Sequence, residues 1–366
     1  MSAKITKNLF KIHQLTGLIS GLVLFIIGLS GSVLVFREEI DKAQLQPPVV
    51  QYAAEQLNTD TSFRNLLKAF PGAEIRLMNA TPEKNESLCF SVRKAKERLT
   101  IYTHPVSGEV LKKVNSNNTI VVWLLNLHYN LHAGQTGKVI VLVTGILFIL
   151  SIITGFVIYR KSIVKVLSFN VAINQKNKRT LSSSLHRTVG VWSLLLNFVL
   201  AVTGVIISYT IAFPPAKKKP QKNSEPQEVI IGFNVDSTLN ELRNKYQGFQ
   251  PNFIRIPAGS KTMSIGGSLP GDFFLYAHYA NKVQVDLATG KADELSPVAT
   301  KSAGDKFNEI LKPLHFGEYG GLPIKLLYCL AGLSIPLLSI TGFLLWTIKK
   351  KKALNKSPKY NYNQAN

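Results

Sequence analysis

Hydrophobic residues are concentrated in four long runs, and the first is separated from the second, and the third from the fourth, by a polar stretch. An α-helix rises about 1.5 Å per residue, so roughly 20 apolar residues cross the hydrocarbon core of a bilayer. The pattern therefore predicts four transmembrane helices. They are expected over Leu15–Phe36, Val139–Tyr159, Val189–Ile211 and Leu326–Ile348.

The two polar stretches follow a similar order of elements. In the first, "SFRNLLKAF" has helical spacing, and "AEIRLMNA", "SLCFSVRK" and "RLTIYTH" alternate as strands do. In the second, "STLNELRNKY" precedes strands that include "FFLYAHYA" and "KVQVDL". We expect two small α+β domains, at 62–113 and 237–293, the second reached through a Pro- and Lys-rich tether at 214–228.

The charges agree with a membrane topology. The formal net charge is +22, and all 21 Asp and Glu residues fall within 37–120 and 212–322. Lysines and arginines gather before the first run, between the second and third, and after the fourth, so the positive-inside rule places both termini and the middle loop in the cytoplasm. The basic composition follows from this topology, and no nucleic-acid partner is expected.

The second half of the chain repeats the spacing of the first. "HQLTG" at 13–17 matches "HRTVG" at 186–190, and a glycine follows each histidine by eighteen residues, Gly31 and Gly204. "LH" at 127–128 and at 314–315 is followed 26 residues later by "TGF". The spacing predicts an internal duplication whose unit is a span, an α+β domain and a second span.

The predicted architecture is thus a bundle of four transmembrane helices with two extracytoplasmic α+β domains. Its segments are the N-terminus and first helix at 1–36, the first domain at 37–120, an outer histidine segment and second helix at 121–160, a cytoplasmic loop at 161–184, the third helix at 185–211, the tether and second domain at 212–313, an outer histidine segment and fourth helix at 314–348, and a basic tail at 349–366.

Four of the seven histidines obey the repeat. His13 and His186 lie at the inner ends of the first and third runs, and His128 and His315 lie on the outer side. Histidines on different helices at one depth can supply both axial ligands of a haem iron, so two stacked haems are expected. The plainer reading makes each histidine an interfacial anchor. His132 is a further candidate that aligns with Tyr319, not with a histidine.

Other residues join this reading. Lys138, Lys325 and Arg187 are candidate partners for haem propionates, or simply set topology. Glycines at 17, 21, 190 and 204 leave room for a macrocycle or for helix packing. His104 and His278 are read as surface residues, and Cys89 and Cys329 form no CxxC metal motif.

The position of the outer histidines leaves a choice. His128 and His315 stand about ten residues before their apolar runs, which is roughly 15 Å of continuous helix. Either the outer site lies in a collar above the membrane, or the helices bend at the glycines near 134–137 and 317–321.

Three segments carry a family resemblance: "LHYNLHAGQTGK", "SLHRTVGVWSLLLNFVLAVTG" and "LHFGEYGGLPIKLLYCLAGLSIPLLSITGFLLW". With them the chain resembles the PepSY-associated transmembrane proteins of bacterial inner membranes over nearly its whole length. The resemblance implies PepSY-like outer domains and four haem ligands, His13, His128, His186 and His315. It also implies a haem-dependent oxidoreductase that reduces ferric siderophores in the periplasm.

The expected function is that of an inner-membrane cytochrome with two haems b, which passes electrons to a periplasmic ferric chelate. No nucleotide-binding glycine fingerprint is present, so the donor is expected to be separate, a quinol or a cytoplasmic flavoprotein. Two alternatives stay open. One is a non-enzymatic, membrane-anchored PepSY binding module, and the other is a small transporter for haem, siderophore or metal.

Overall fold

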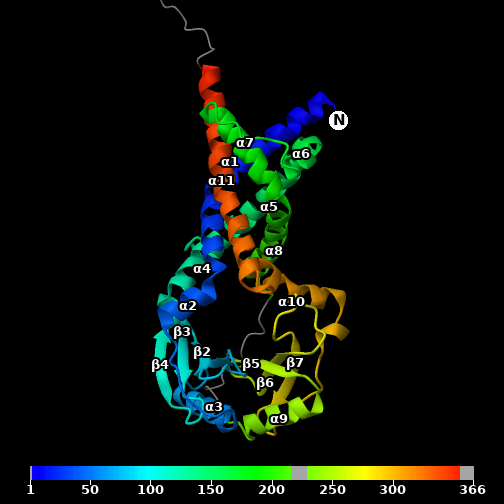
Figure 1. Cartoon of the computed structure of the whole chain (residues 1–366). Coiled ribbons are helices and arrows are strands. Elements are labelled where there is room, and N and C mark those ends of the chain that lie inside the picture. Colours follow the sequence, from blue (N-terminus) through cyan, green and yellow to red (C-terminus); the bar gives the residue numbers. More distant parts are fainter. Residues whose placement is uncertain (1, 216–228, 355–366) are drawn as a thin grey trace, which may run out of the picture. The chain divides into compact units, whose positions relative to one another are not determined.

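The computed structural model describes residues 2–215 and 229–354, and it divides into two units (Figure 1). A helical unit comprises described residues of 1–36, 124–215 and 315–366, and an α/β unit comprises those of 37–123 and 216–314. The predicted tether at 216–228 and the end of the basic tail, 355–366, lie outside the described residues.

Four helices of the helical unit are long and apolar enough to cross a membrane, as the hydrophobic runs predict. They include α1 (Ala3–Leu34), α5 (Gly134–Tyr159), α8 (Leu194–Ala212) and α11 (Gly321–Leu354). The third run is divided at Ser193, because α7 (Lys178–Trp192) ends just before this residue and α8 starts just after it. Between α5 and α7 lie η3 (Arg160–Ser162) and α6 (Ile163–Leu167).

Two shorter helices carry the outer histidines, α4 (Ile120–Asn130) and α10 (Ala303–Phe316). Neither continues directly into the next span. Gly134 has φ +56° where α5 begins, and Gly317 and Gly321 have φ +73° and +60° before α11, a left-handed conformation that glycine adopts without steric cost. Of the two arrangements expected for the outer histidines, the structure therefore contains the one in which the chain bends at these glycines.

The α/β unit holds one seven-stranded antiparallel sheet in the order β4-β3-β2-β1-β5-β6-β7. The strands are β1 (Glu74–Leu77), β2 (Leu88–Lys94), β3 (Glu97–Thr103), β4 (Val110–Asn115), β5 (Gln250–Ile256), β6 (Thr262–Ser268) and β7 (Asn281–Asp286). The helices are α2 (Arg37–Leu45), α3 (Thr59–Ala69) and α9 (Val235–Lys245), with short η1 (Ala54–Gln56), η2 (Ser116–Asn118) and η4 (Val298–Thr300). The expectation of two separate α+β domains is corrected, because β1 pairs with β5 and joins both strand sets in one sheet.

The β1–β5 junction is symmetric. Ile75 pairs with Ile256, Arg76 with Arg255 and Leu77 with Ile254, so the register is centred on the two arginines. Like charges directly opposite one another destabilise a sheet. Glu74 offsets this repulsion, since its Oε1 lies 2.6 Å from Arg76 Nη2 and 2.6 Å from Arg255 Nε.

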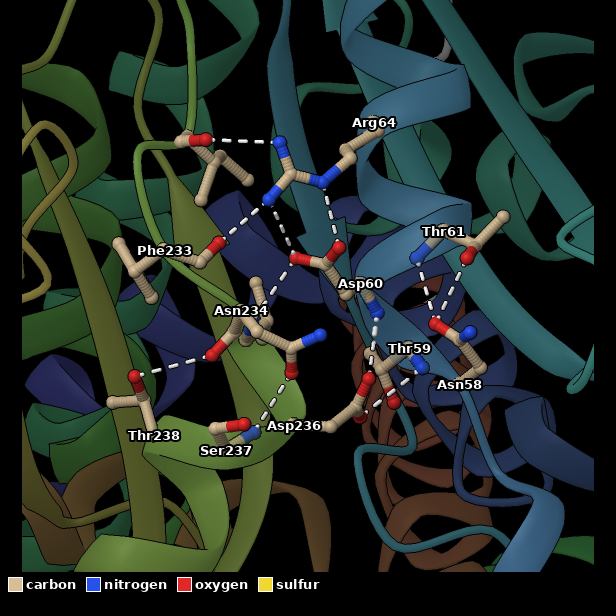
Figure 2. A network of polar contacts seen from close by, with 12 residues as sticks. Asn58, Thr59, Asp60, Thr61, Arg64, Phe233, Asn234, Asp236, Ser237 and Thr238 are labelled. Atoms are coloured by element: carbon tan, nitrogen blue, oxygen red, sulfur yellow. Dashed lines mark hydrogen bonds and ion pairs between the residues drawn. The ribbon is translucent and has the colours of Figure 1, made fainter.

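The first turns of α3 and α9 cap one another (Figure 2). The carboxylate of Asp236 accepts hydrogen bonds from the backbone N–H groups of Thr59 and Asp60 at 3.1 and 3.0 Å, and Asp60 accepts one from Val235 at 3.1 Å. Arg64 binds Asp60 and donates to the carbonyl of Phe233 at 2.6 Å. A carboxylate at a helix N-terminus meets unpaired N–H groups and the positive end of the helix dipole, so each helix stabilises the other.

One apolar core joins both strand sets and includes Phe63, Phe90, Leu239, Ile254 and Val283, all buried. The alternation of the sequence selects these positions, as in β2, where every second side chain is buried. One predicted strand is wrong: "FFLYAHYA" (273–280) forms turns that lead into β7. Hydrogen bonds hold this segment in turns, because Asp272 accepts from Leu269 N and from Asn281 Nδ2.

Candidate functional site

The helical unit brings the four repeat-related histidines together as two pairs. The ring centres of His13 and His186 are 6.1 Å apart with their planes at 83°, and we call this the inner pair. The ring centres of His128 and His315 are 6.4 Å apart at 54°, and we call this the outer pair. Each pair draws one histidine from each half of the chain, as the repeat predicts.

The inner rings are oriented by the helices opposite them. Nδ1 of His13, on α1, lies 3.0 Å from the carbonyl of Ser151 and 3.2 Å from Thr154 Oγ1, both on α5. Nδ1 of His186, on α7, lies 2.9 Å from Thr341 Oγ1 on α11. The two halves thus use the threonine of the same "TGF" segment.

The outer rings are held in the same manner by the other two helices. Nδ1 of His128 lies 3.1 Å from Ser30 Oγ and 3.1 Å from the carbonyl of Ile27, both on α1. Nδ1 of His315 lies 2.9 Å from Thr203 Oγ1 on α8. The outer pair therefore lies beside residues of the apolar runs, and a collar above them is not needed.

The hydrogen-bond partners of Nδ1 indicate which ring nitrogen carries the proton. Ser30, Thr154, Thr203 and Thr341 each donate to a carbonyl four residues earlier on their own helix, at 2.7 to 2.8 Å. A carbonyl oxygen can only accept, so Nδ1 of His13 and of His128, which face the carbonyls of Ser151 and Ile27, carries the hydrogen. At His186 and His315 the hydroxyls already donate to their own helices, which favours the same tautomer. Nε2 then keeps its lone pair, which is the state that binds a metal ion.

A glycine follows each of these hydroxyl residues and lies against the same imidazole. A Cβ added at Gly31 would stand 2.9 Å from Cε1 of His128, and one at Gly204 would stand 3.0 Å from Cε1 of His315. For the inner rings the distances are 3.1 Å at Gly155 and 3.5 Å at Gly342. Each histidine therefore has a Ser-Gly or Thr-Gly cradle, in which the hydroxyl orients the ring and the glycine makes room for it.

The spacing within each pair suits one metal ion between two imidazoles. Two metal–nitrogen bonds of about 2.0 Å, each with a ring centre about 1.2 Å behind its nitrogen, separate the ring centres by about 6.4 Å. Within residues 2–215 and 229–354 there is no group of three or more His, Cys, Asp or Glu side chains that could hold a metal ion. Each centre can thus draw two ligands from these residues, and other ligands would come from a bound group.

The remaining predicted residues lie elsewhere. His132 is exposed in the turn that follows α4, with φ +54°. His104 Nδ1 accepts from the backbone of Val106 at 3.2 Å and stabilises a turn of the α/β unit, and His278 is exposed there.

The candidate propionate partners are close in sequence to the histidines but differ in exposure. Lys138 and Lys325, in the first turns of α5 and α11, are half-buried, whereas Arg187 is exposed. Arg187 Nε donates to the carbonyl of Ser183 at 3.0 Å, and its guanidinium lies 5.9 Å from the ring centre of Tyr159. Their role toward a bound group remains a prediction.

The four glycines singled out in the sequence separate into two kinds. Gly204 contacts His315, whereas a Cβ at Gly17 or Gly21 would meet no described atom within 4 Å, and one at Gly190 would make only an ordinary contact with Leu338. Sequence reasoning missed the role of Ser30, Thr154, Thr203 and Thr341. Their signal was available, because "LSG", "VTG" and both "TGF" segments recur at fixed distances from the histidines.

Comparison with known proteins assigns the chain to a family. A search of curated proteins finds no match to the chain. The family model for the PepSY-associated TM region, in contrast, matches residues 10–349, a range that includes all four paired histidines and the whole sheet. The chain therefore belongs to the family of PepSY-associated transmembrane proteins.

Proposed function

We propose that this protein is a di-haem cytochrome of the b type in the bacterial inner membrane, an oxidoreductase that passes electrons outward to a ferric chelate, with a ferric siderophore as its substrate. The observation that carries the proposal is the occurrence of two histidine pairs with ring centres 6.1 and 6.4 Å apart. The protein is surrounded by membrane lipid, and a separate donor, a quinol or a cytoplasmic flavoprotein, supplies the electrons.

The residues present fit haem. His13 with His186, and His128 with His315, would supply the axial ligands, and the four macrocycle nitrogens would supply the other positions that the described residues do not. Gly17 and Gly21 follow His13 on α1 and leave open space beside the helix, because a Cβ at either position would meet nothing within 4 Å. Lys138, Lys325 and Arg187 are proposed to pair with the propionates.

Haem, when bound, would supply a reversible one-electron couple at each level. The chain's own contribution is to hold each imidazole by a hydrogen bond at Nδ1, which keeps Nε2 basic and free to bind a metal ion. The apolar residues around Leu24, Phe148, Ala201 and Ile335 pack between the helices and exclude water from the bundle.

The proposed topology follows from charge. The acid-free ends of the spans, rich in lysine and arginine, face the cytoplasm, and the α/β unit faces the periplasm. We further propose that the chain arose by duplication. The repeated histidine, hydroxyl and glycine positions and the symmetric β1–β5 register support it.

The proposed reduction is outer-sphere, so the ferric chelate forms no bond with the haem iron or with the histidines. The four paired histidines would hold the haem groups on both sides, so the chelate would receive the electron without becoming a ligand of the haem iron. Hard-oxygen chelators hold Fe³⁺ more tightly than Fe²⁺, and one-electron reduction therefore releases the iron.

The test is an absorption spectrum of detergent-purified protein, oxidised and then reduced with dithionite, with haem counted per chain. Two haems with sharp reduced α and β bands, and bands that reoxidise on adding ferric siderophore, are the expected result. Haem-free protein from haem-supplied cells would overturn the proposal in favour of a binding module. Chelate uptake into proteoliposomes without a reductant would indicate a transporter.

A further inference from the structure

A groove of about 690 Å³ lies at the inner end of the helical unit. Three basic side chains line it, Lys178, Arg179 and Arg187, together with the polar side chains of Asn174, Asn177 and Ser183. Small-molecule sites occupy about 300–1,000 Å³, so the groove is large enough for a nucleotide-sized ligand.

The groove has no negative charge of its own. No Asp or Glu occurs in 121–211 or in 323–366, the two stretches that contain all of its lining residues. The positive-inside rule accounts for an excess of cations at this end, but not for their convergence with amide and hydroxyl groups in one hollow. A bound anion from outside the chain would balance the positive charge of the groove.

The walls of the groove are ordered by local hydrogen bonds. Asn177 caps α7 by accepting from the N–H groups of Arg179 and Thr180 at 3.1 and 3.0 Å. The backbone N–H of Asn174 donates to Ser184 Oγ at 3.2 Å, which ties the incoming segment to α7. Arginine forks on an ordered wall suit the oxygens of a phosphate group.

The same two helices hold the inner pair. Ser183 precedes His186 by three residues, about 4.5 Å along α7, and Arg187 is its neighbour. The opposite wall includes Ile348 of α11, the helix whose Thr341 accepts from His186. A ligand in the groove would thus lie within about one helical turn of the residue that binds the inner centre.

We infer that the groove binds the phosphate group of a reduced flavin nucleotide that donates electrons to the inner centre. This inference rests on the proposed function and selects between its two donors. A quinol carries no charge and has no use for three cations. A nicotinamide nucleotide delivers hydride, a two-electron donor, whereas the proposed centres would take up one electron at a time.

The electron balance is simple. Oxidation of one reduced flavin breaks two N–H bonds and yields two electrons and two protons. The two electrons are accounted for by the reduction of two ferric ions to ferrous ions. The two protons remain on the donor side.

Direct binding tests the groove independently of haem. Full-length protein in phosphatidylcholine nanodiscs is titrated with flavin mononucleotide and with riboflavin, which lacks the phosphate, and flavin fluorescence is followed. We expect at least ten-fold tighter binding of the mononucleotide, competition by inorganic phosphate, and loss of the preference in the double variant K178Q/R179Q. The matched variant K4Q/K7Q, which removes the same charge from α1, should keep it.

Equal binding of the two flavins, or an equal loss in both variants, would overturn the inference. So would abolition of the preference by phosphatidylglycerol in the nanodisc, since the groove would then be a headgroup site. The donor role is tested by rapid mixing with photoreduced flavin mononucleotide, where K178Q/R179Q should slow haem reduction at least ten-fold and leave reduction by riboflavin unchanged. An unchanged rate would overturn the donor role, whereas haem-free protein that still prefers the mononucleotide would overturn only the cytochrome.

Discussion

In the first half of the chain Leu24 stands eleven residues after His13, and in the second half Asn197 stands eleven residues after His186. Leu24 packs in an apolar cluster with Phe148, whereas the Asn197 amide donates to Ser193 Oγ at 3.0 Å and to Ser334 Oγ at 2.9 Å. The residues that touch the imidazoles are the same in kind in both halves. Symmetry is thus kept around the four paired histidines, and it is lost at this pair of positions, where one residue packs in an apolar cluster and the other makes polar contacts.

The comparison predicts, first, that the two halves contribute equally at the outer pair. H128A and H315A should each leave one haem per chain and lower ferric-chelate reduction by at least 100-fold, because one axial ligand is missing in either variant. Haem content and reductase rate are the measurements. H104A and H278A are the matched controls and should keep both haems, and full activity in either outer variant would contradict the mechanism.

The second prediction grades the glycine cradles. Alanine at Gly31 or Gly204 would place a Cβ 2.9 or 3.0 Å from a histidine carbon, so the ring must move, whereas at Gly342 the distance of 3.5 Å is an ordinary contact. We expect G31A and G204A to lose at least half of the outer haem and G342A to keep both haems, as counted in purified protein. Equal loss of haem in all three variants would contradict the prediction, because the contact at Gly342 is not a close one.

The third prediction concerns Glu74, which forms ion pairs with Arg76 and Arg255 at the β1–β5 junction. Burial opposes ionisation of its carboxyl, but the hydrogen bonds and charges of Arg76 and Arg255 outweigh burial and lower its pKa below the ordinary 4.5. The resulting stability is present above pH 4.5 and is lost as the pH falls through the lowered pKa.

We therefore expect E74Q to destabilise the sheet by about 2 kcal/mol at pH 7, with the difference from the unmodified protein disappearing at lower pH. Hydrogen exchange of the β1 and β5 amides measures the effect. E97Q, at an exposed position of β3, is the control and should change little. A difference that persists unchanged at pH 3 would show that the charge is not responsible.

The smallest effect is expected at the position that distinguishes the halves. Asn197 Oδ1 is buried and lacks a hydrogen-bond partner among the described residues. N197L should therefore leave the thermal midpoint unchanged or raise it slightly, whereas L24N should cost about 1–3 kcal/mol by burying an unsatisfied amide. Thermal unfolding of both variants decides, and a strongly destabilised N197L would show that the polar contact is needed.

Much of the helical unit could be predicted from the sequence, because its signals are local or periodic. Runs of about twenty apolar residues indicate transmembrane helices. The equal spacing from His13 to Gly31 and from His186 to Gly204 shows that the first and third runs correspond to one another. The hydroxyl acceptors were missed because serine and threonine in a membrane helix usually bond only to their own backbone.

The fusion of the two strand sets could not be predicted. Ile75 and Ile256 lie 181 residues apart, and nothing near either residue marks its partner, because strand pairing depends on an edge that only the folded sheet presents. The strand expected at 273–280 failed for a related reason. Aromatic residues favour strands, but Asp272 and Asn281 close this segment into turns.

The centred register of β1 and β5 bears on what happens when synthesis of the chain stops early. A product that ends in the loop between α5 and α7 would contain β1 with one edge unpaired, and an open edge is a template for another strand. Because the register is centred on Arg76 and Arg255, a second copy of β1 offers Arg76 against Arg76 and Ile75 against Leu77 in the place of β5. Truncated chains would therefore pair with one another about a two-fold axis, and the junction that unites the complete protein would make its fragments self-complementary.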